Sequence, residues 1–215
     1  MSAGEVSPAA SGGGQVTARA GALACVLMGF IVIAASFMHW VHAGHGIDAN
    51  GFGFVNRRYA ELTGLQLTLG WFTTALGLLI IVGGLAALYA VVRQGSSPRP
   101  GFTLVTGAGV AAVVIAGAIP VRPVGLTLPL GSLGATSAAG DLGEPVVGIF
   151  VLLAAALTSV VIGLAGVSLG ARDAVAQRWL AVAIAAGAVV GVLAVALVWW
   201  WLGRGALDVG VLVPA

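Results

Sequence analysis

Five long apolar segments dominate this sequence and constrain its fold more than any other feature. Each is close to the ~20 residues that a helix needs to cross roughly 30 Å of hydrocarbon. No Asp, Glu, Arg or His interrupts them. The segments are 20–38, 69–92, 102–119, 146–170 and 180–202. They predict an all-α fold, an integral membrane bundle of five transmembrane helices with two long outer loops.

Charged side chains are too scarce to cover a water-soluble surface of this size. The chain has 215 residues, of which 60% are hydrophobic and only 7% are charged, whereas a soluble domain carries about 25% charged residues. Lipid must therefore cover much of the surface. The chain has no Lys and is rich in Ala, Gly and Val. That bias is typical of a GC-rich bacterial genome, so we expect a location in the bacterial plasma membrane.

Two tails flank the expected transmembrane domain. The segment 1–18 is rich in Gly, Ser and Ala and offers too little apolar surface to fold, so we expect it to be disordered. The segment 19–203 contains all five apolar segments, and 204–215 follows as a short tail. Because the number of spans is odd, the two tails are expected on opposite sides of the membrane.

The placement of arginine predicts which side each tail occupies. The two shortest loops are basic, with Arg93 and Arg99 in one and Arg172 and Arg178 in the other. Short basic loops stay on the cytoplasmic side of a membrane. We therefore expect the N-terminus in the cytoplasm and the C-terminus outside.

The two long outer loops share a short pattern. Residues 64–70 and 125–131 both read G-L-x-L-x-L-G, and strict alternation of apolar residues is the period of a strand. The pattern predicts a small two-stranded cap over the outer ends of the helices. The alternative is that residues 65–69 form only the first turn of the second helix.

One cluster of metal-ligating residues follows the first apolar segment. It consists of His39, His42, His45 and Asp48, and zinc or copper accepts imidazole nitrogens together with a carboxylate. A helix end would place His39 and His42 on one face. No established zinc pattern such as HExxH is present, so we interpret the cluster as polar residues leaving the membrane and expect no cofactor. The alternative is a metal or haem site.

Small residues recur at helical spacing in the last two apolar segments. Gly166 and Gly170 lie four residues apart in one, and Gly187 and Gly191 lie four residues apart in the other. In lipid, such pairs let helix backbones approach closely. We expect these glycines to pack the helices on one another within the chain; the alternative is that they contact a partner subunit. Helix–loop–helix also occurs twice in the same orientation, which indicates two helix pairs and an additional fifth helix.

Motifs that carry chemistry are otherwise missing from the sequence. It contains no P-loop, no GxSxG, no HExxH and no cysteine pair. No ionisable residue lies at the expected middle of the membrane, although transport pathways are usually marked by such residues, and no basic stripe indicates nucleic-acid binding. We therefore expect a non-enzymatic structural or accessory subunit, or a scaffold, of a cell-envelope complex. Its expected partners are the lipid bilayer and other membrane subunits. The alternatives are a metal- or haem-associated accessory protein and a small transporter or channel.

Overall fold

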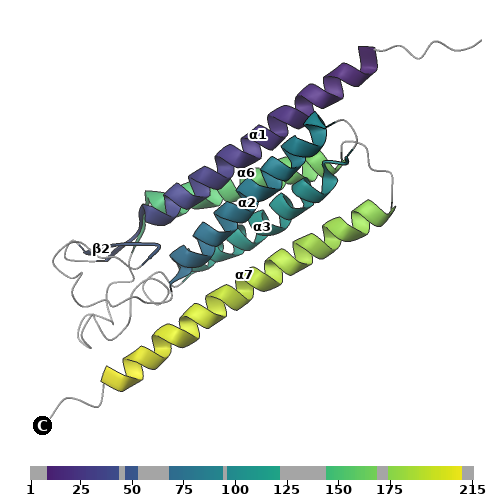
Figure 1. The fold of residues 1–215 in the computed structure, drawn as a ribbon. Helices are drawn as coiled ribbons and strands as arrows, with labels where there is room; N and C mark the ends of the chain where they lie inside the picture. The colour runs from purple at the N-terminus through teal and green to yellow at the C-terminus, as the bar shows by residue number, and fades with distance from the viewer. Residues whose placement is uncertain are drawn as a thin grey trace, which may run out of the picture.

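The structure is a computed structural model that describes residues 9–43, 47–52, 68–93, 96–121, 144–168 and 174–209. Five long helices run alongside one another in it (Figure 1), and the predicted all-α fold is confirmed. All five are long and apolar enough to cross a membrane. They are α1 (Ala9–Phe37), α2 (Leu69–Val92), α3 (Arg99–Ala118), α6 (Val147–Ser168) and α7 (Ala174–Val209).

The helix ends agree with the apolar segments to different degrees. The bounds of α2 coincide with those predicted, whereas α3 begins earlier, at Arg99. Pro100 lies in the first turn of α3, where its missing N–H leaves no helical hydrogen bond unmade. The helix α1 begins at Ala9, inside the segment expected to be disordered, and α7 extends beyond 180–202 in both directions. Hydropathy marks only the part of a helix that suits lipid, and an established helix adds further residues at little cost.

Four of the helices form a closed ring, and the fifth lies outside it. Within the ring, α1 packs on α2 and α6, and α3 packs on the same two helices. The helix α7 packs mainly on α3 and lies along the outside of the bundle (Figure 1). In the apolar window of α3, 56% of the residues are buried, compared with 22% in α7. The centre of the molecule is therefore α3, and α7 is the additional helix.

Glycines lie where the ring helices approach most closely. A Cβ on Gly29 of α1 would lie 2.7 Å from the carbonyl oxygen of Gly77 in α2, and a Cβ on Gly83 of α2 would lie 2.8 Å from the carbonyl oxygen of Gly101 in α3. Side chains at these positions would force the backbones apart. Lipid supplies no hydrophobic drive for helix association, so this close contact is what holds such helices together.

A small three-stranded sheet closes one end of the ring. Its strands are β1 (His39–Ala43), β2 (Ile47–Asn50) and β3 (Glu144–Pro145), in the order β2-β1-β3, with both pairs antiparallel. These segments differ from those of the predicted cap. Leu69, which belongs both to the cap pattern and to the predicted second helix, is the first residue of α2, and residues 65–67 and 126–130 lie outside the described residues.

Trp40 anchors this sheet inside the protein. Its side chain is fully buried, and its Nε1–H donates a hydrogen bond of 2.7 Å to the carbonyl oxygen of Ala35. Its backbone carbonyl accepts a hydrogen bond of 2.9 Å from the N–H of Val146, just before α6. Gly51 lies against the indole ring, and its own N–H donates to the carbonyl oxygen of Ser36. One tryptophan therefore joins the ends of α1, β2 and α6.

Candidate functional site

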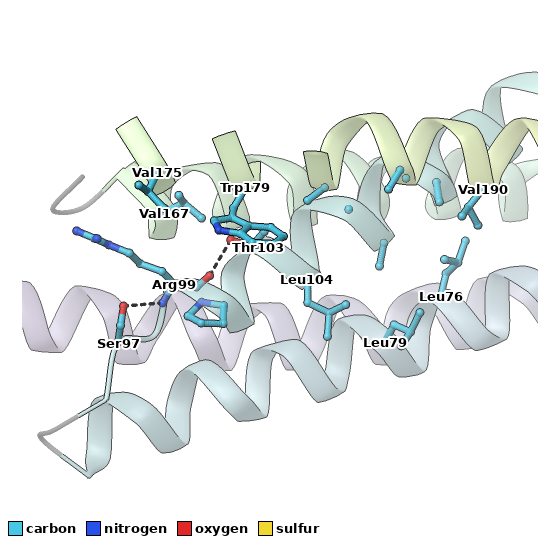
Figure 2. Close-up of a pocket in the computed structure, with 17 residues that line it drawn as sticks. Leu76, Leu79, Ser97, Arg99, Thr103, Leu104, Val167, Val175, Trp179 and Val190 are labelled. Carbon is cyan, nitrogen blue, oxygen red and sulfur yellow. Dashed lines mark hydrogen bonds between the residues drawn. The ribbon is translucent and has the colours of Figure 1, made fainter. Parts of the chain in front are cut away.

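A groove runs between α7 and the ring, and it is the candidate site in this part of the molecule (Figure 2). Its volume is about 910 Å³. It is lined mostly by α3 and α7, with contributions from α2 and α6. The lining residues are Leu76, Leu79, Ser97, Arg99, Pro100, Thr103, Leu104, Gly107, Ala108, Ala111, Val167, Val175, Trp179, Ala183, Ala186, Gly187 and Val190.

The groove exists because α3 and α7 touch through small residues. A Cβ on Gly187 would meet the backbone of Gly107, and a Cβ on Gly107 would lie 3.0 Å from the carbonyl oxygen of Ala183. The backbones therefore approach closely along this line. Beside the contact, lining positions such as Ala108 and Ala186 carry only methyl groups, which leave space between the two helices.

The two ends of the groove differ in chemistry. Figure 2 shows Ser97, Arg99 and Thr103 toward one end, with Leu76, Leu79 and Val190 toward the other. Thr103 Oγ1–H donates a hydrogen bond of 2.9 Å to the carbonyl oxygen of Arg99, and the Arg99 N–H donates to Ser97 Oγ at 3.4 Å. Both hydroxyls thus stabilise the start of α3. Among the described lining residues, Arg99 carries the one ionisable side chain.

The charged end of the groove coincides with an end of the bundle that is rich in arginine. Arg93 follows α2, Arg99 begins α3, and Arg178 lies in the second turn of α7. Trp179 lines the groove at this end and is 64% exposed. Tryptophan side chains favour the level of the lipid headgroups. The polar end of the groove therefore lies where the helices are expected to leave hydrocarbon.

The histidine cluster is arranged differently from the helical face that was predicted. His39 and His42 belong to strand β1, and the strand register shifts between His39 and Val41. The consecutive residues Trp40 and Val41 are both buried, while His39 and His42 are both exposed. The irregularity therefore leaves both histidines on the exposed side. A strand replaces the helix because Trp40 is fixed by its backbone and indole hydrogen bonds.

The sheet register also places acidic residues beside His42. Asp48 of β2 lies opposite it on one side, and Glu144 of β3 lies opposite it on the other. The histidine pattern does not point to Glu144, because this residue lies about a hundred residues away in the chain. His45 falls outside the described residues. Among the residues that the structure describes, no three ligating groups lie close enough to hold a metal ion.

The predicted packing glycines lie at contacts within the chain wherever they are described. Gly166 lies against the ring of Phe102, and Gly191 lies against Ala111, whose carbonyl oxygen would be 2.9 Å from an added Cβ. Gly170 is outside the described residues. Gly163, which sequence analysis did not single out, packs on α3 as closely as Gly166 does. Its spacing of three from Gly166 falls outside the four-residue pattern.

Known proteins give no guide to these features. No protein-family model matches the chain, and neither a curated protein nor a solved structure is significantly similar to it. Function has to be inferred from the helices, the groove and the sheet.

Proposed function

We propose that this chain is a non-enzymatic accessory subunit of the bacterial plasma membrane that binds another membrane protein through α7. The observation that carries the proposal is the asymmetry of the bundle. Each ring helix packs on two other ring helices, whereas α7 packs mainly on α3 alone. An additional helix that contributes little to the ring has most of its surface available for a partner.

The outward face of α7 has the composition of a helix-packing surface. Ala181 and Ala185 lie four residues apart and are exposed, as are Val182 and Val189. At ~100° per residue, Ala185 lies about 160° around the helix from Gly187, which contacts α3. Small residues at this spacing let a second helix approach closely in lipid. We therefore assign this face to a transmembrane helix of the partner protein.

Purification in a mild detergent tests the proposal. The variant Ala185→Leu places a bulky side chain on the outward face of α7, and Ala154→Leu makes the same change at an exposed position of α6. We expect a stoichiometric partner, identified by mass spectrometry, to co-purify with the wild type and Ala154→Leu but not with Ala185→Leu. Equal recovery from both variants would show that the partner does not use this face.

A second candidate function, a metal-associated accessory protein, is favoured by one observation. The register places His42 between Asp48 and Glu144, and imidazole with carboxylates is a ligand set that zinc accepts. Elemental analysis distinguishes the two functions, because one equivalent of zinc or copper lost in His42→Ala would favour the metal-associated protein.

A further inference from the structure

We propose that three exposed arginines form a belt that binds the headgroup phosphates of anionic phospholipids around one end of the bundle. The arginine belt consists of Arg19 in α1, Arg93 directly after α2 and Arg178 in α7, and all three residues are exposed. This inference rests on the membrane location in the proposed function, but it does not depend on the partner surface of α7.

The contact between α1 and α2 fixes the depth of Arg19. A Cβ on Gly84 of α2 would lie 3.0 Å from the carbonyl oxygen of Ala22 in α1, so these two residues are level with each other. Arg19 precedes Ala22 by three residues, on a helix that begins at the arginine-rich end of the bundle (Figure 1). At 1.5 Å per residue, the backbone of Arg19 is therefore ~4.5 Å closer to that end than Gly84 is.

Two successive contacts fix the depth of Arg178. Gly187 of α7 meets the backbone of Gly107 in α3. A Cβ on Gly83 of α2 would lie 2.8 Å from the carbonyl oxygen of Gly101, also in α3. Arg178 lies nine residues before the first contact on α7, and Gly101 lies six residues before it on α3, which runs in the same direction. The difference of three residues places the backbone of Arg178 ~4.5 Å closer to the arginine-rich end than Gly83 is.

The direction of the side chains brings Arg93 into the same layer. Its backbone lies nine residues beyond Gly84, about 13.5 Å along α2. Helical side chains lean toward the N-terminus of their own helix, so we expect those of Arg19 and Arg178 to lean away from the middle of the bundle. Arg93 leans the other way, because its guanidinium donates a hydrogen bond to the Tyr89 hydroxyl and lies 5.4 Å from the centre of that ring. The three charges therefore converge on one layer.

This layer has the chemistry of a site for phospholipid headgroups. Trp179 is 64% exposed and Tyr89 is 59% exposed, and such amphipathic rings favour the headgroup level. Guanidinium groups bind phosphate oxygens through charge-assisted hydrogen bonds. The acidic residues among the described ones all belong to the opposite end of the bundle; they are Asp48, Glu144 and Asp208. Within the described part of the chain, a lipid phosphate therefore meets no competing carboxylate in this layer.

The spread of the arginines around the bundle favours lipid over a protein partner. The helices α1 and α7 lie on opposite sides of the bundle (Figure 1), with α2 between them. A partner helix on α7 could reach Arg178 but not Arg19, whereas the lipids around a membrane protein contact every outer helix. Anionic lipids of the cytoplasmic leaflet attract basic residues close to the membrane surface. The arginine belt is also on the side that the short basic loops predict to be cytoplasmic.

Quenching of tryptophan fluorescence by brominated lipids tests the arginine belt at α7. In the reporter protein, phenylalanine replaces four exposed tryptophans, which are Trp71, Trp199, Trp200 and Trp201. Trp179 then reports on the lipid beside Arg178, because Trp40 is fully buried. The full-length protein is reconstituted with phosphatidylglycerol or phosphatidylcholine that carry identical chains brominated near the glycerol. One arginine near the membrane surface contributes ~1 kcal/mol, so we expect phosphatidylglycerol to bind about fivefold more tightly beside Trp179.

Loss of single charges shows whether each arginine acts locally. Arg178→Gln should remove the preference measured at Trp179, and Arg19→Gln, which removes the same charge from the opposite side of the bundle, should retain it. A second reporter, with Tyr89→Trp and Trp179→Phe, should behave in the opposite way: Arg93→Gln removes the preference and Arg178→Gln retains it. High salt should weaken the preference at both reporters, because it screens exposed charges. Circular dichroism shows whether each variant is folded.

Three results would overturn the proposal. They are equal quenching by the two lipids, a preference at one reporter alone, and a preference that survives loss of the neighbouring arginine in a folded variant. Ala185→Leu separates this inference from the proposed function, because it should abolish partner binding and leave the lipid preference unchanged. Loss of the preference in that variant would show that the lipid effect depends on the partner surface and not on the arginine belt.

Discussion

The contact between α3 and α7 supports a quantitative prediction about Gly187. An alanine Cβ at this position would touch the carbonyl oxygen of Gly107, and it would lie 3.0 Å from the carbonyl carbon and 3.2 Å from the Cα of the same residue. All three are backbone atoms, which cannot rotate away as a side chain can. The helices must therefore separate by several tenths of an ångström along the whole contact, which includes Gly191.

Overpacking of this kind costs about 1–3 kcal/mol. Replacing glycine by alanine also favours a helix by up to ~1 kcal/mol, which would mask part of the loss. Gly117→Ala is the matched control, because Gly117 is an exposed residue of α3 with nothing within 4 Å of an added Cβ. The difference between the two variants isolates the clash, since the helix preference is the same in both. We expect the equilibrium constants for unfolding of the two variants to differ by about 5- to 150-fold.

Unfolding by sodium dodecyl sulfate in mixed micelles measures this difference. Tryptophan fluorescence is a suitable signal, because four of the six tryptophans lie on α7 and report on its separation from the ring. Far-ultraviolet circular dichroism shows whether helices are lost at the same point. Equal midpoints for Gly187→Ala and Gly117→Ala would refute the close contact between α3 and α7, and with it the origin of the groove.

Three further predictions concern the sheet, the topology and the histidines. Trp40→Phe should lower the free energy of unfolding by about 0.5–1.5 kcal/mol, because the carbonyl oxygen of Ala35 loses the indole donor and keeps the N–H of Met38. Trp71→Phe should change it little because Trp71 is 48% exposed; thermal unfolding in detergent compares the two. On a Cys25→Ala background, single cysteines near the two ends of the chain should be labelled from opposite sides of the membrane. The N-terminal cysteine should be labelled from the cytoplasm. Labelling of both cysteines from the same side would exclude five spans. Purified protein should contain no stoichiometric metal and no haem by elemental analysis and visible absorption; an equivalent of zinc or copper that disappears in a His39→Ala/His42→Ala variant would reverse that expectation.

The helices could be predicted from the sequence because their signal is local. A window of apolar residues shows directly that the segment prefers lipid to water. Both ends of α2 were therefore predicted at the correct residue. The ends of α1 and α7 were not predicted, because Ala9 and Val209 lie in segments that mix polar and apolar residues. Hydropathy does not mark a helix end in such a segment.

The sheet and the groove could not be predicted because they depend on distant residues. Val41 pairs with Pro145, and no local pattern in either segment predicts this pairing. The glycine spacing singled out Gly187 as a packing residue, but spacing does not specify which helix it meets. The groove follows from that partner, because α7 packs on Gly107 and the neighbouring lining residues include small alanines.

The sheet also sets an order of events during synthesis of the chain. The edge of β1 at Val41 is completed only by Pro145, which follows about a hundred residues later. At ~5–20 residues per second the ribosome takes about 5–20 s to supply it. During that interval α1, α2 and α3 can already be inserted in the membrane. The backbone N–H and C=O groups on the β3 side of β1 are still unpaired. A nascent chain that stops after α3 therefore presents an open strand edge, and the arrival of α6 both completes the ring and closes that edge.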